Sequence, residues 1–153
     1  MAHKVDELPL FSFAEQFSAA VTAILQRSTL RKNSNVYDQI VDANESILAN
    51  LDEGFDQQSD DAFAKYLYYS KGSIAEVMRR LRRAARRGQV ASQDVARLQP
   101  QAEELGRMLG GFIKYLKQSG FKDRGCFRAS QTRADRAGDQ GSAIKDRRSR
   151  IKD

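Results

Sequence analysis

The chain is poor in the residues that usually carry covalent or metal chemistry. Its 153 residues include one cysteine, one histidine, two prolines and no tryptophan. The single cysteine, Cys126, excludes an internal disulfide and suits a reducing compartment. His3 lies near the N-terminus, far in sequence from Cys126, and no metal-ligand spacing or glycine-rich phosphate loop occurs. We therefore expect no enzyme activity, no cofactor and no metal.

Long apolar runs are also missing. No stretch of the sequence reaches the 18 or so apolar residues of a membrane-spanning helix, and the N-terminus carries no signal-peptide pattern. We expect a soluble, cytoplasmic protein that makes no membrane contact. A hydrophobic content of 41% and the scarcity of proline suit a single all-helical domain, and the length suffices to bury a core.

Apolar residues recur at three- and four-residue steps in four segments, which is the spacing of one helix face. The predicted helices cover 12–29, 36–54, 60–87 and 92–120. Because the connections between them are short, consecutive helices should run antiparallel. The sequence therefore predicts an all-α, up-down-up-down four-helix bundle.

The helix boundaries have local signals. Ser12 and Glu15 have the spacing of a capping box, which predicts a helix start at Ser12. Ser59, followed by two aspartates, predicts the start of the third helix, because the hydroxyl accepts from unpaired amides and the acids face the positive end of the helix dipole. Gly88 stands where a helix-terminating glycine is expected.

The last predicted helix contains residues that weaken helices. Pro100 costs about 3 kcal/mol inside a helix, so the helix either kinks there, which we favour, or starts there. Gly106 and Gly110 are four residues apart, with Gly111 beside them. We expect these glycines to let another backbone approach closely, either within the subunit or between subunits.

The third predicted helix ends in the densest positive charge of the chain. Its apolar side chains fall on one side, and six arginines fall on the other: Arg79, Arg80, Arg82, Arg83, Arg86 and Arg87. The planar guanidinium donates two parallel hydrogen bonds to phosphate and keeps its charge. We expect these arginines to bind the nucleic-acid backbone with little sequence preference. Base stacking is not expected, because no aromatic residue interleaves with them.

Two other interpretations of the arginines remain open. They could pair with carboxylates of a neighbouring subunit, namely Asp38, Asp42, Asp52 or Asp56, or they could be a solvated helix end. A binding role predicts a strong salt dependence, with affinity falling by roughly 10³ between 50 and 200 mM salt if about six phosphates are neutralised.

The composition changes after residue 121. Residues 1–121 carry 16 basic and 15 acidic side chains, whereas residues 122–153 carry 10 and 5. Few large apolar residues occur in the second part, so we expect a disordered basic tail. The domain organisation is then a lead over 1–11, a bundle over 12–120 and a tail over 121–153. The tail either has no role or gives a second nucleic-acid contact through Arg128, Arg133, Arg136, Arg147, Arg148 and Arg150.

Two further groups are candidate sites. A carboxylate near a helix C-terminus is disfavoured by the dipole, so Glu53 needs a partner. We expect a structural polar clamp of Asn50, Glu53 and Ser73 between the second and third helices, in preference to a catalytic acid. Tyr66 belongs to the apolar stripe, and at least one of the next two tyrosines, 68 and 69, should point outward, into a subunit contact or onto a base; we favour the subunit contact.

Several segments resemble a known family. NESILANLDEGF, FAKYLYYSKGSIAEV and ELGRMLGGFIKYLK are similar to the small four-helix-bundle proteins first noticed in intervening sequences of bacterial 23S ribosomal RNA genes. That family includes the accessory variability protein of diversity-generating retroelements. The resemblance covers about residues 10–120. This chain departs from the family pattern at Leu48, where a proline is usual, and in its basic tail.

The resemblance implies a four-helix bundle that assembles into a ring-like homopentamer. In the retroelement branch, such a ring binds nucleic acid and a reverse transcriptase. Our first hypothesis is a non-enzymatic oligomeric scaffold that binds the RNA or DNA backbone through a basic face, as an accessory to a reverse transcriptase. The second is a protein–protein adaptor whose arginine face docks an acidic partner without nucleic acid.

Overall fold

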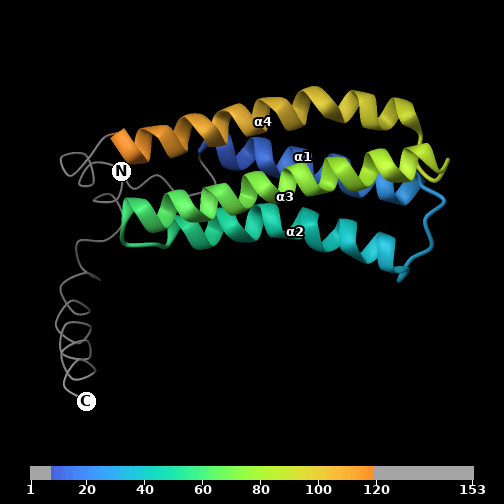
Figure 1. The fold of residues 1–153 in the computed structure, drawn as a ribbon, viewed down its shortest axis with the longest axis horizontal. Coiled ribbons are helices and arrows are strands. Elements are labelled where there is room, and N and C mark those ends of the chain that lie inside the picture. The colour runs from blue at the N-terminus through green and yellow to red at the C-terminus, as the bar shows by residue number, and fades with distance from the viewer. Residues whose placement is uncertain (1–7, 119–153) are drawn as a thin grey trace, which may run out of the picture. The chain divides into compact units, whose positions relative to one another are not determined.

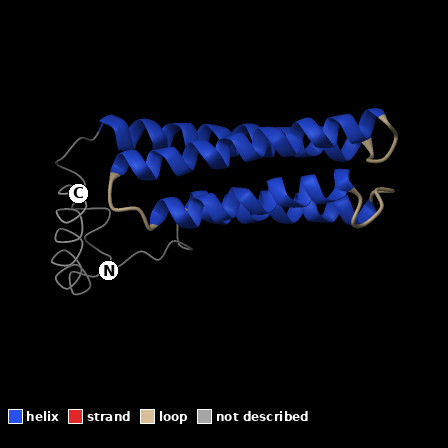
Figure 2. Ribbon diagram, turned by 60° about the horizontal axis from the view of Figure 1, so that its bottom comes forward, coloured by secondary structure: helices blue, strands red, loops and turns tan. Residues whose placement is uncertain are grey.

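The computed structural model describes residues 8–118, and within them the chain is a bundle of four helices. These are α1 (Pro9–Arg27), α2 (Asn35–Phe55), α3 (Asp60–Arg86) and α4 (Ser92–Gln118). Successive helices run in opposite directions (Figure 1), and only helices and loops occur in the described residues (Figure 2). The predicted up-down-up-down bundle is confirmed. The predicted tail and most of the lead lie outside the described residues.

The first helix begins at Pro9 and not at the predicted Ser12. The backbone amides of Phe11 and Ser12 donate to the carbonyl of Leu8, at 2.9 and 3.2 Å, so Ser12 lies inside the first turn. Proline suits this first turn because its φ is helical and its missing amide needs no partner there. Phe11 is buried and holds the turn on the core. The predicted capping box at Ser12 is therefore wrong, as is the assignment of residues 9–11 to the lead.

Serine hydroxyls cap the next two helices. The hydroxyl of Ser59 accepts from the amide of Ala62 at 3.1 Å, which confirms the predicted start of α3. Ser34 does the same for the amide of Tyr37 at 3.3 Å. After α3, Gly88 has a φ of 71°, the left-handed conformation that ends helices and favours glycine.

The fourth helix runs without interruption from Ser92 to Gln118 and contains Pro100. The alternative in which the helix starts at Pro100 is therefore wrong. Pro100 is exposed. Because proline has no backbone amide hydrogen, it cannot donate to the carbonyl of Ala96, four residues earlier.

The core lies between all four helices, with α3 packed extensively against both α2 and α4, while α1 contacts α2 and α4. A chain of edge-to-face aromatic contacts crosses one end of the bundle. Phe63 of α3 has its ring centroid 5.9 Å from that of Phe55 on α2 and 5.2 Å from that of Phe112 on α4. The largest fully buried side chains are Phe17, Ile40, Ile47, Leu67, Leu81, Leu98, Leu105 and Leu109.

Close packing occurs between α2 and α3, at Gly54. A Cβ atom added there would lie 2.9 Å from the Cβ atom of Tyr66 and 3.0 Å from the ring of Phe63. Such distances are too short for carbon atoms in contact, so any side chain at residue 54 would push α2 and α3 apart.

The glycines of α4 behave differently. A Cβ atom added at Gly106 or Gly111 would meet nothing within 4 Å, and at Gly110 it would meet only the Nζ atom of Lys71, at 3.6 Å. Within the described residues, the close backbone approach predicted for these glycines is therefore not found. An approach between subunits stays a prediction.

The expected polar clamp of Asn50, Glu53 and Ser73 is wrong. The side-chain amide of Asn50 donates to a carbonyl of its own helix at 2.7 Å, and the hydroxyl of Ser73 does the same at 3.0 Å. Glu53 is exposed, and its carboxylate accepts from a glutamine four residues later at 3.2 Å. Each of the three is satisfied locally, so none joins α2 to α3.

Buried polar links between helices lie elsewhere. The hydroxyl of Ser70, which is fully buried in α3, donates to the carbonyl of Ile47 in α2 at 2.7 Å. The side-chain amide of Asn44 in α2 donates to the carbonyl of Ser18 in α1 at 3.1 Å. Ser70 falls at the helical spacing of the apolar residues of α3, and a serine at such a core position is a signal for a buried hydrogen bond.

Candidate nucleic-acid interface

The six arginines of α3 point away from the core, but they do not share one environment. Arg79, Arg82, Arg83, Arg86 and Arg87 are exposed, while Arg80 is partly buried. Arginine at successive helix positions projects over a wide arc, so the side chains reach towards α2, towards solvent and towards α4. The predicted arginine face is thus divided among three surroundings.

Arg80 is committed to the contact between α2 and α3. Its Nε atom donates to a carboxylate oxygen of Glu76 at 3.0 Å, and the two side chains form an ion pair at 2.9 Å. Its Nη1 atom also donates to the side-chain carbonyl of Gln39 on α2. The charge of Arg80 is therefore offset within the chain, and the prediction that Arg80 contacts nucleic acid is not supported by its geometry.

Arg82 lies on the side of α3 that meets α4. Its Nη2 atom donates to the side-chain carbonyl of Gln99, whose amide in turn donates to Glu103 at 2.9 Å. Beside it is an open groove between the end of α3 and the start of α4. The groove is lined by Arg82, Ala85, Arg86, Ser92, Val95, Ala96 and Gln99. Its apolar floor and basic rim suit a ligand that is anionic and has an apolar part.

The remaining arginines of α3 are displayed outward. Within residues 8–118, Arg79, Arg83, Arg86 and Arg87 form no ion pair, since those ion pairs involve Arg27, Arg80 and Arg107. Their position in the last turns of α3 also favours positive charge, because the helix dipole is negative there. Pairing of these arginines with aspartates of a neighbouring subunit stays a prediction.

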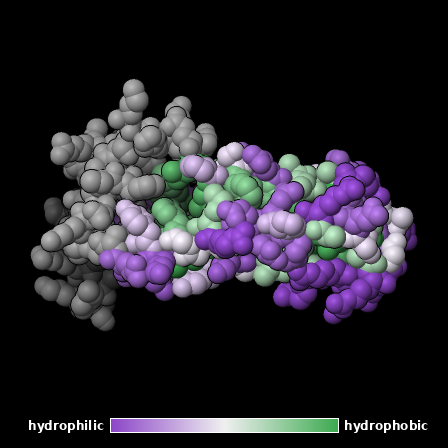
Figure 3. Space-filling model, turned by 90° about the horizontal axis from the view of Figure 1, so that it is seen from above, coloured by the Kyte–Doolittle hydropathy of each residue, from purple (hydrophilic) through white to green (hydrophobic). Residues whose placement is uncertain are grey.

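The fold adds basic residues that sequence reasoning missed. Since the helices alternate in direction, the α1–α2 loop and the α3–α4 turn lie at the same end, where the amide of Thr29 donates to the carbonyl of Gln89 at 3.0 Å. Figure 3 shows hydrophilic side chains gathered over this end. We call it the basic end and define it by Arg27, Arg31, Lys32, Arg79, Arg82, Arg83, Arg86, Arg87 and Arg97. The loop sequence LRKNSN, read with the predicted topology, was the available signal.

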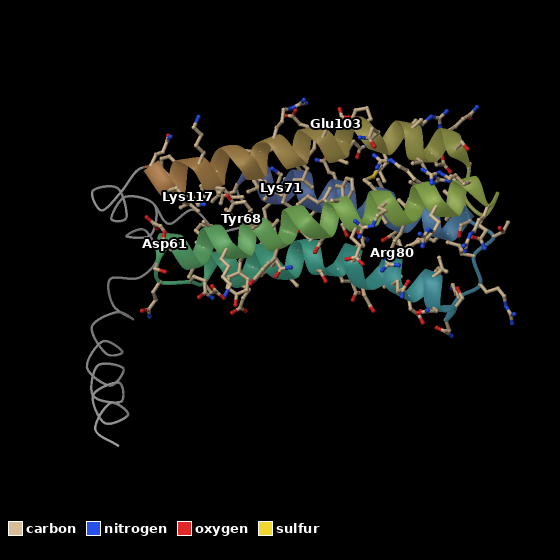
Figure 4. The ribbon with its side chains drawn as sticks, in the orientation of Figure 1. Asp61, Tyr68, Lys71, Arg80, Glu103 and Lys117 are labelled. Carbon is tan, nitrogen blue, oxygen red and sulfur yellow. The ribbon has the colours of Figure 1, made fainter. Side chains whose placement is uncertain are left out.

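Two first-turn carboxylates, Asp38 of α2 and Asp94 of α4, lie at the basic end. Asp94 forms an ion pair with Arg27 at 3.3 Å, and its side chain is mostly buried, with 16% exposed. The other end of the bundle has the opposite character. The last turn of α2, the α2–α3 connection and the first turn of α3 carry Asp52, Glu53, Asp56, Asp60 and Asp61. Figure 4 shows Asp61 at that end, distant from Arg80. Charge along α3 is therefore segregated, with aspartates at its start and arginines at its end, whereas the last turns of α4, at the same end as these aspartates, carry Lys114 and Lys117.

The other predicted site residues have the following places. Tyr68 and Tyr69 are exposed, at 49% and 48%, which confirms that at least one of them points outward, and Tyr66 is partly buried.

Among residues 8–118, no cluster of three or more histidine, cysteine or carboxylate side chains could hold a metal ion. Likewise, none of the helices in that range combines the length and apolar character that a membrane crossing needs. Arg147, Arg148, Arg150 and the other tail arginines lie outside the described residues.

Comparison with known proteins gives a family. The profile of the family described as "23S rRNA-intervening sequence protein" matches residues 6–111. Among solved structures, the chain is similar to a protein of unknown function from the S23 ribosomal protein family of Bacteroides thetaiotaomicron. The TM-score is 0.62 at 19% identity, covering 69% of this chain and 98% of that one, which supports the fold. The comparison with curated proteins finds no match. The chain belongs to the family of 23S rRNA-intervening sequence proteins.

Proposed function

We propose that this protein is a non-enzymatic, oligomeric scaffold that binds the backbone of RNA or DNA through its basic end. The observation that carries the proposal is the gathering of loop and helix cations at one end of the bundle, with four arginines of α3 outside any ion pair within residues 8–118. A surface with such segregated charge attracts polyanions. Guanidinium groups match phosphate oxygens in geometry as well as charge.

The basic end favours backbone contacts over base reading. Phosphate contacts fix position and supply affinity, but they carry little sequence information. Arg79, Arg83, Arg86 and Arg87 are long, exposed side chains on a helix surface, and Arg86 borders the groove beside Arg82. We therefore expect affinity that depends strongly on salt and weakly on sequence.

Assembly would strengthen this binding. The family resemblance supports a homopentameric ring, in which each copy would present its own basic end. Several weak backbone contacts on one strand raise the overall affinity through effective concentration. The resemblance to the retroelement branch also supports a role as an accessory to a reverse transcriptase, and the single cysteine fits a cytoplasmic setting.

A protein–protein adaptor is the second candidate, and the groove beside Arg82 favours it. Its floor includes Val95 and Ala96, and its rim includes Arg82 and Arg86. An acidic peptide with an apolar anchor would fill this groove, whereas phosphate would leave its apolar floor uncovered. Nucleic acid binding still has the wider support, because the basic end extends well beyond the groove.

The proposal is tested by fluorescence anisotropy with a labelled RNA oligomer, at two salt concentrations, together with a mass measurement in solution. The fourfold variant Arg79/Arg83/Arg86/Arg87→Glu should bind at least about 100-fold more weakly and with a flatter salt response. The matched control is Arg107→Glu. Arg107 is an exposed arginine of α4, bonded to Glu104 at 3.0 Å and outside the basic end, and its substitution should change affinity by less than about twofold.

Three outcomes would count against the proposal. These are a salt-independent affinity, equal binding by the fourfold variant, or a wild-type protein that binds no RNA or DNA at all. The adaptor would be favoured if the wild-type protein binds no nucleic acid but does bind an acidic peptide with an apolar anchor, and if the Arg82→Ala variant loses that peptide.

A further inference from the structure

A seam between α3 and α4 runs along the bundle surface, away from the basic end. Three contacts mark its course. Arg82 donates to Gln99 near the basic end. Further along, the Nζ atom of Lys71 lies over Gly110, and beyond it the Nζ atom of Lys117 donates to the hydroxyl of Tyr68 at 3.2 Å. Figure 4 shows Lys117, Tyr68 and Lys71 between the two helices. From residue 68 to residue 86, α3 extends about 27 Å at 1.5 Å per residue.

The seam carries the positive charge of the basic end onward. Lys71, Lys114 and Lys117 are exposed, and Lys114 follows Gly110 by one helical turn. The ion pairs formed within residues 8–118 involve arginines and no lysine. Basic side chains therefore line the seam from Arg82 to Lys117, with one carboxylate among them, that of Glu103, which accepts from Gln99 at 2.9 Å. Beyond Lys117, the acidic first turn of α3 begins, where Figure 4 places Asp61.

Tyr68 is the aromatic residue of this seam. Its side chain is 49% exposed, and the ammonium group of Lys117 lies 4.9 Å from the ring centroid. The hydrogen bond from Lys117 to the hydroxyl holds the ring in position. A fixed, exposed aromatic ring beside a cation is the arrangement on which proteins stack the bases of single strands.

We propose that the α3–α4 seam binds single-stranded nucleic acid, with phosphates near Lys71, Lys117 and Arg82 and a base stacked on Tyr68. This inference rests on the proposed function of the basic end, and it narrows the ligand from nucleic acid in general to single strands. A duplex keeps its base faces stacked inside, so only a single strand can use the ring. Stacking on a base is one of the two alternatives that the sequence leaves open for an exposed tyrosine, and we choose it here because Tyr68 lies on the same side of α3 as Arg82.

The charge of the seam favours a nucleic acid over a second copy of the chain. Lysine is depleted in protein–protein interfaces, and aromatic residues are enriched. Two copies joined through this seam would bring Lys71 and Lys117 of each against like charges. A single strand supplies phosphate for the lysines and a base for the ring at the same time.

The test compares two labelled strands of roughly 12 nucleotides, one of uridines and one abasic, which have the same number of phosphates. The wild-type protein should bind the uridine strand about tenfold more tightly, the size expected for one base on an aromatic ring. Tyr68→Ala should remove this preference and leave affinity for the abasic strand unchanged. Tyr68→Phe keeps the ring and should keep the preference.

Tyr69→Ala is the matched control. Tyr69 is exposed to 48%, and the Nζ atom of Lys65 lies 5.8 Å from its ring centroid, so its exposure and its neighbouring cation resemble those of Tyr68. Its ring, however, contacts that of Tyr66 at 5.7 Å, towards α2 and away from the seam. Tyr69→Ala should leave the preference for bases intact. Lys71→Gln should weaken binding of both strands equally and lower the salt slope by about 0.7.

The outcomes separate this inference from the proposed function. If the wild-type protein binds both strands equally well and salt-dependently, stacking is overturned and the basic end keeps its role. If neither strand binds, both proposals fall. If Tyr68→Ala splits an oligomer while the preference for bases survives, the seam is a contact between copies and this inference is overturned.

Discussion

The third helix meets its two neighbours in different ways. Towards α2 it is tightly fitted: Gly54 leaves no room for a Cβ atom, Ser70 bonds the carbonyl of Ile47, and Arg80 bonds Gln39. Towards α4 the surface beside the core is open, with Gly106 and Gly110 uncrowded and a groove beside Arg82. Both sides contain polar and small residues, but they join the helices differently. Towards α2 the hydrogen bond of Ser70 is fully buried, whereas towards α4 the bonds from Arg82 to Gln99 and from Lys117 to Tyr68 are exposed.

This difference indicates that the α2 side of α3 serves stability and the α4 side serves binding. Residues that bond across α2 and α3 have their polar atoms satisfied, so they stabilise the bundle and have little left to offer a ligand. The lysines and arginines along α4 are exposed and add little to stability, since isolated surface charges seldom do. Substitutions on the two sides of α3 should therefore affect different measurements.

The largest expected effect on stability comes from Gly54. The change Gly54→Ala should lower the free energy of unfolding by about 2 kcal/mol, because the new Cβ atom would lie 2.9 Å from that of Tyr66. The same change at Gly72, an exposed position inside α3 with nothing within 4 Å, should raise it by about 0.5–1 kcal/mol through helix propensity. Urea unfolding measures both. Equal effects of the two changes would show that the α2 side is not crowded.

Ser70 should have the next largest effect. The change Ser70→Ala removes the buried hydrogen bond to Ile47 and should cost about 1.5 kcal/mol in unfolding free energy. Ser73→Ala is the matched control, because that hydroxyl bonds a carbonyl of its own helix near the surface, and the change should cost less than about 0.5 kcal/mol. Thermal unfolding followed by circular dichroism distinguishes them. A larger loss at Ser73 than at Ser70 would restore the clamp that the sequence suggested.

A smaller difference in stability is expected between the adjacent residues Arg79 and Arg80. Arg80→Ala should cost about 1 kcal/mol of stability, because Arg80 bonds both Glu76 and Gln39 and its side chain is 29% exposed. Arg79→Ala should leave stability within about 0.3 kcal/mol and should weaken RNA binding more than Arg80→Ala does. The paired measurements are urea unfolding and anisotropy with RNA. The reverse ranking in both would mean that Arg80, not Arg79, faces the ligand.

The smallest effect is expected at Gly110. The change Gly110→Ala places a Cβ atom 3.6 Å from the Nζ atom of Lys71, an ordinary contact, so stability should rise by about 0.5 kcal/mol through helix propensity. The mass in solution should stay the same. If Gly110→Ala instead dissociates an oligomer, the open side of α3 is where another subunit approaches, as the sequence allowed.

Much of the fold follows from local patterns. The periodic apolar residues and the Ser59 cap placed α3 within one residue of its observed end at Arg86, because both signals depend on neighbours along the chain. The start of α1 was missed because two signals competed, and Pro9 in the first turn prevailed over the serine at residue 12. The residue spacing of a capping box occurs often in sequences by chance. The burial of Phe11 in the core fixes where α1 begins.

The candidate site was less predictable, because it depends on contacts between distant residues. The arginine run was evident in the sequence, but the partner of Arg80 lies 41 residues away, on α2. Likewise, Ser70 and Ile47 are 23 residues apart. The basic loop residues Arg31 and Lys32 could have been added by reasoning from the topology, since antiparallel helices bring alternate loops together.

Pro100 has a consequence for the groove beneath Arg82 and Arg86. Because Pro100 cannot donate to the carbonyl of Ala96, this turn of α4 has one backbone hydrogen bond fewer than its neighbours and is easier to deform. Ala96 also lines the groove. A molecule seated there would thus contact a turn of α4 that is held by fewer backbone hydrogen bonds than a regular helical turn.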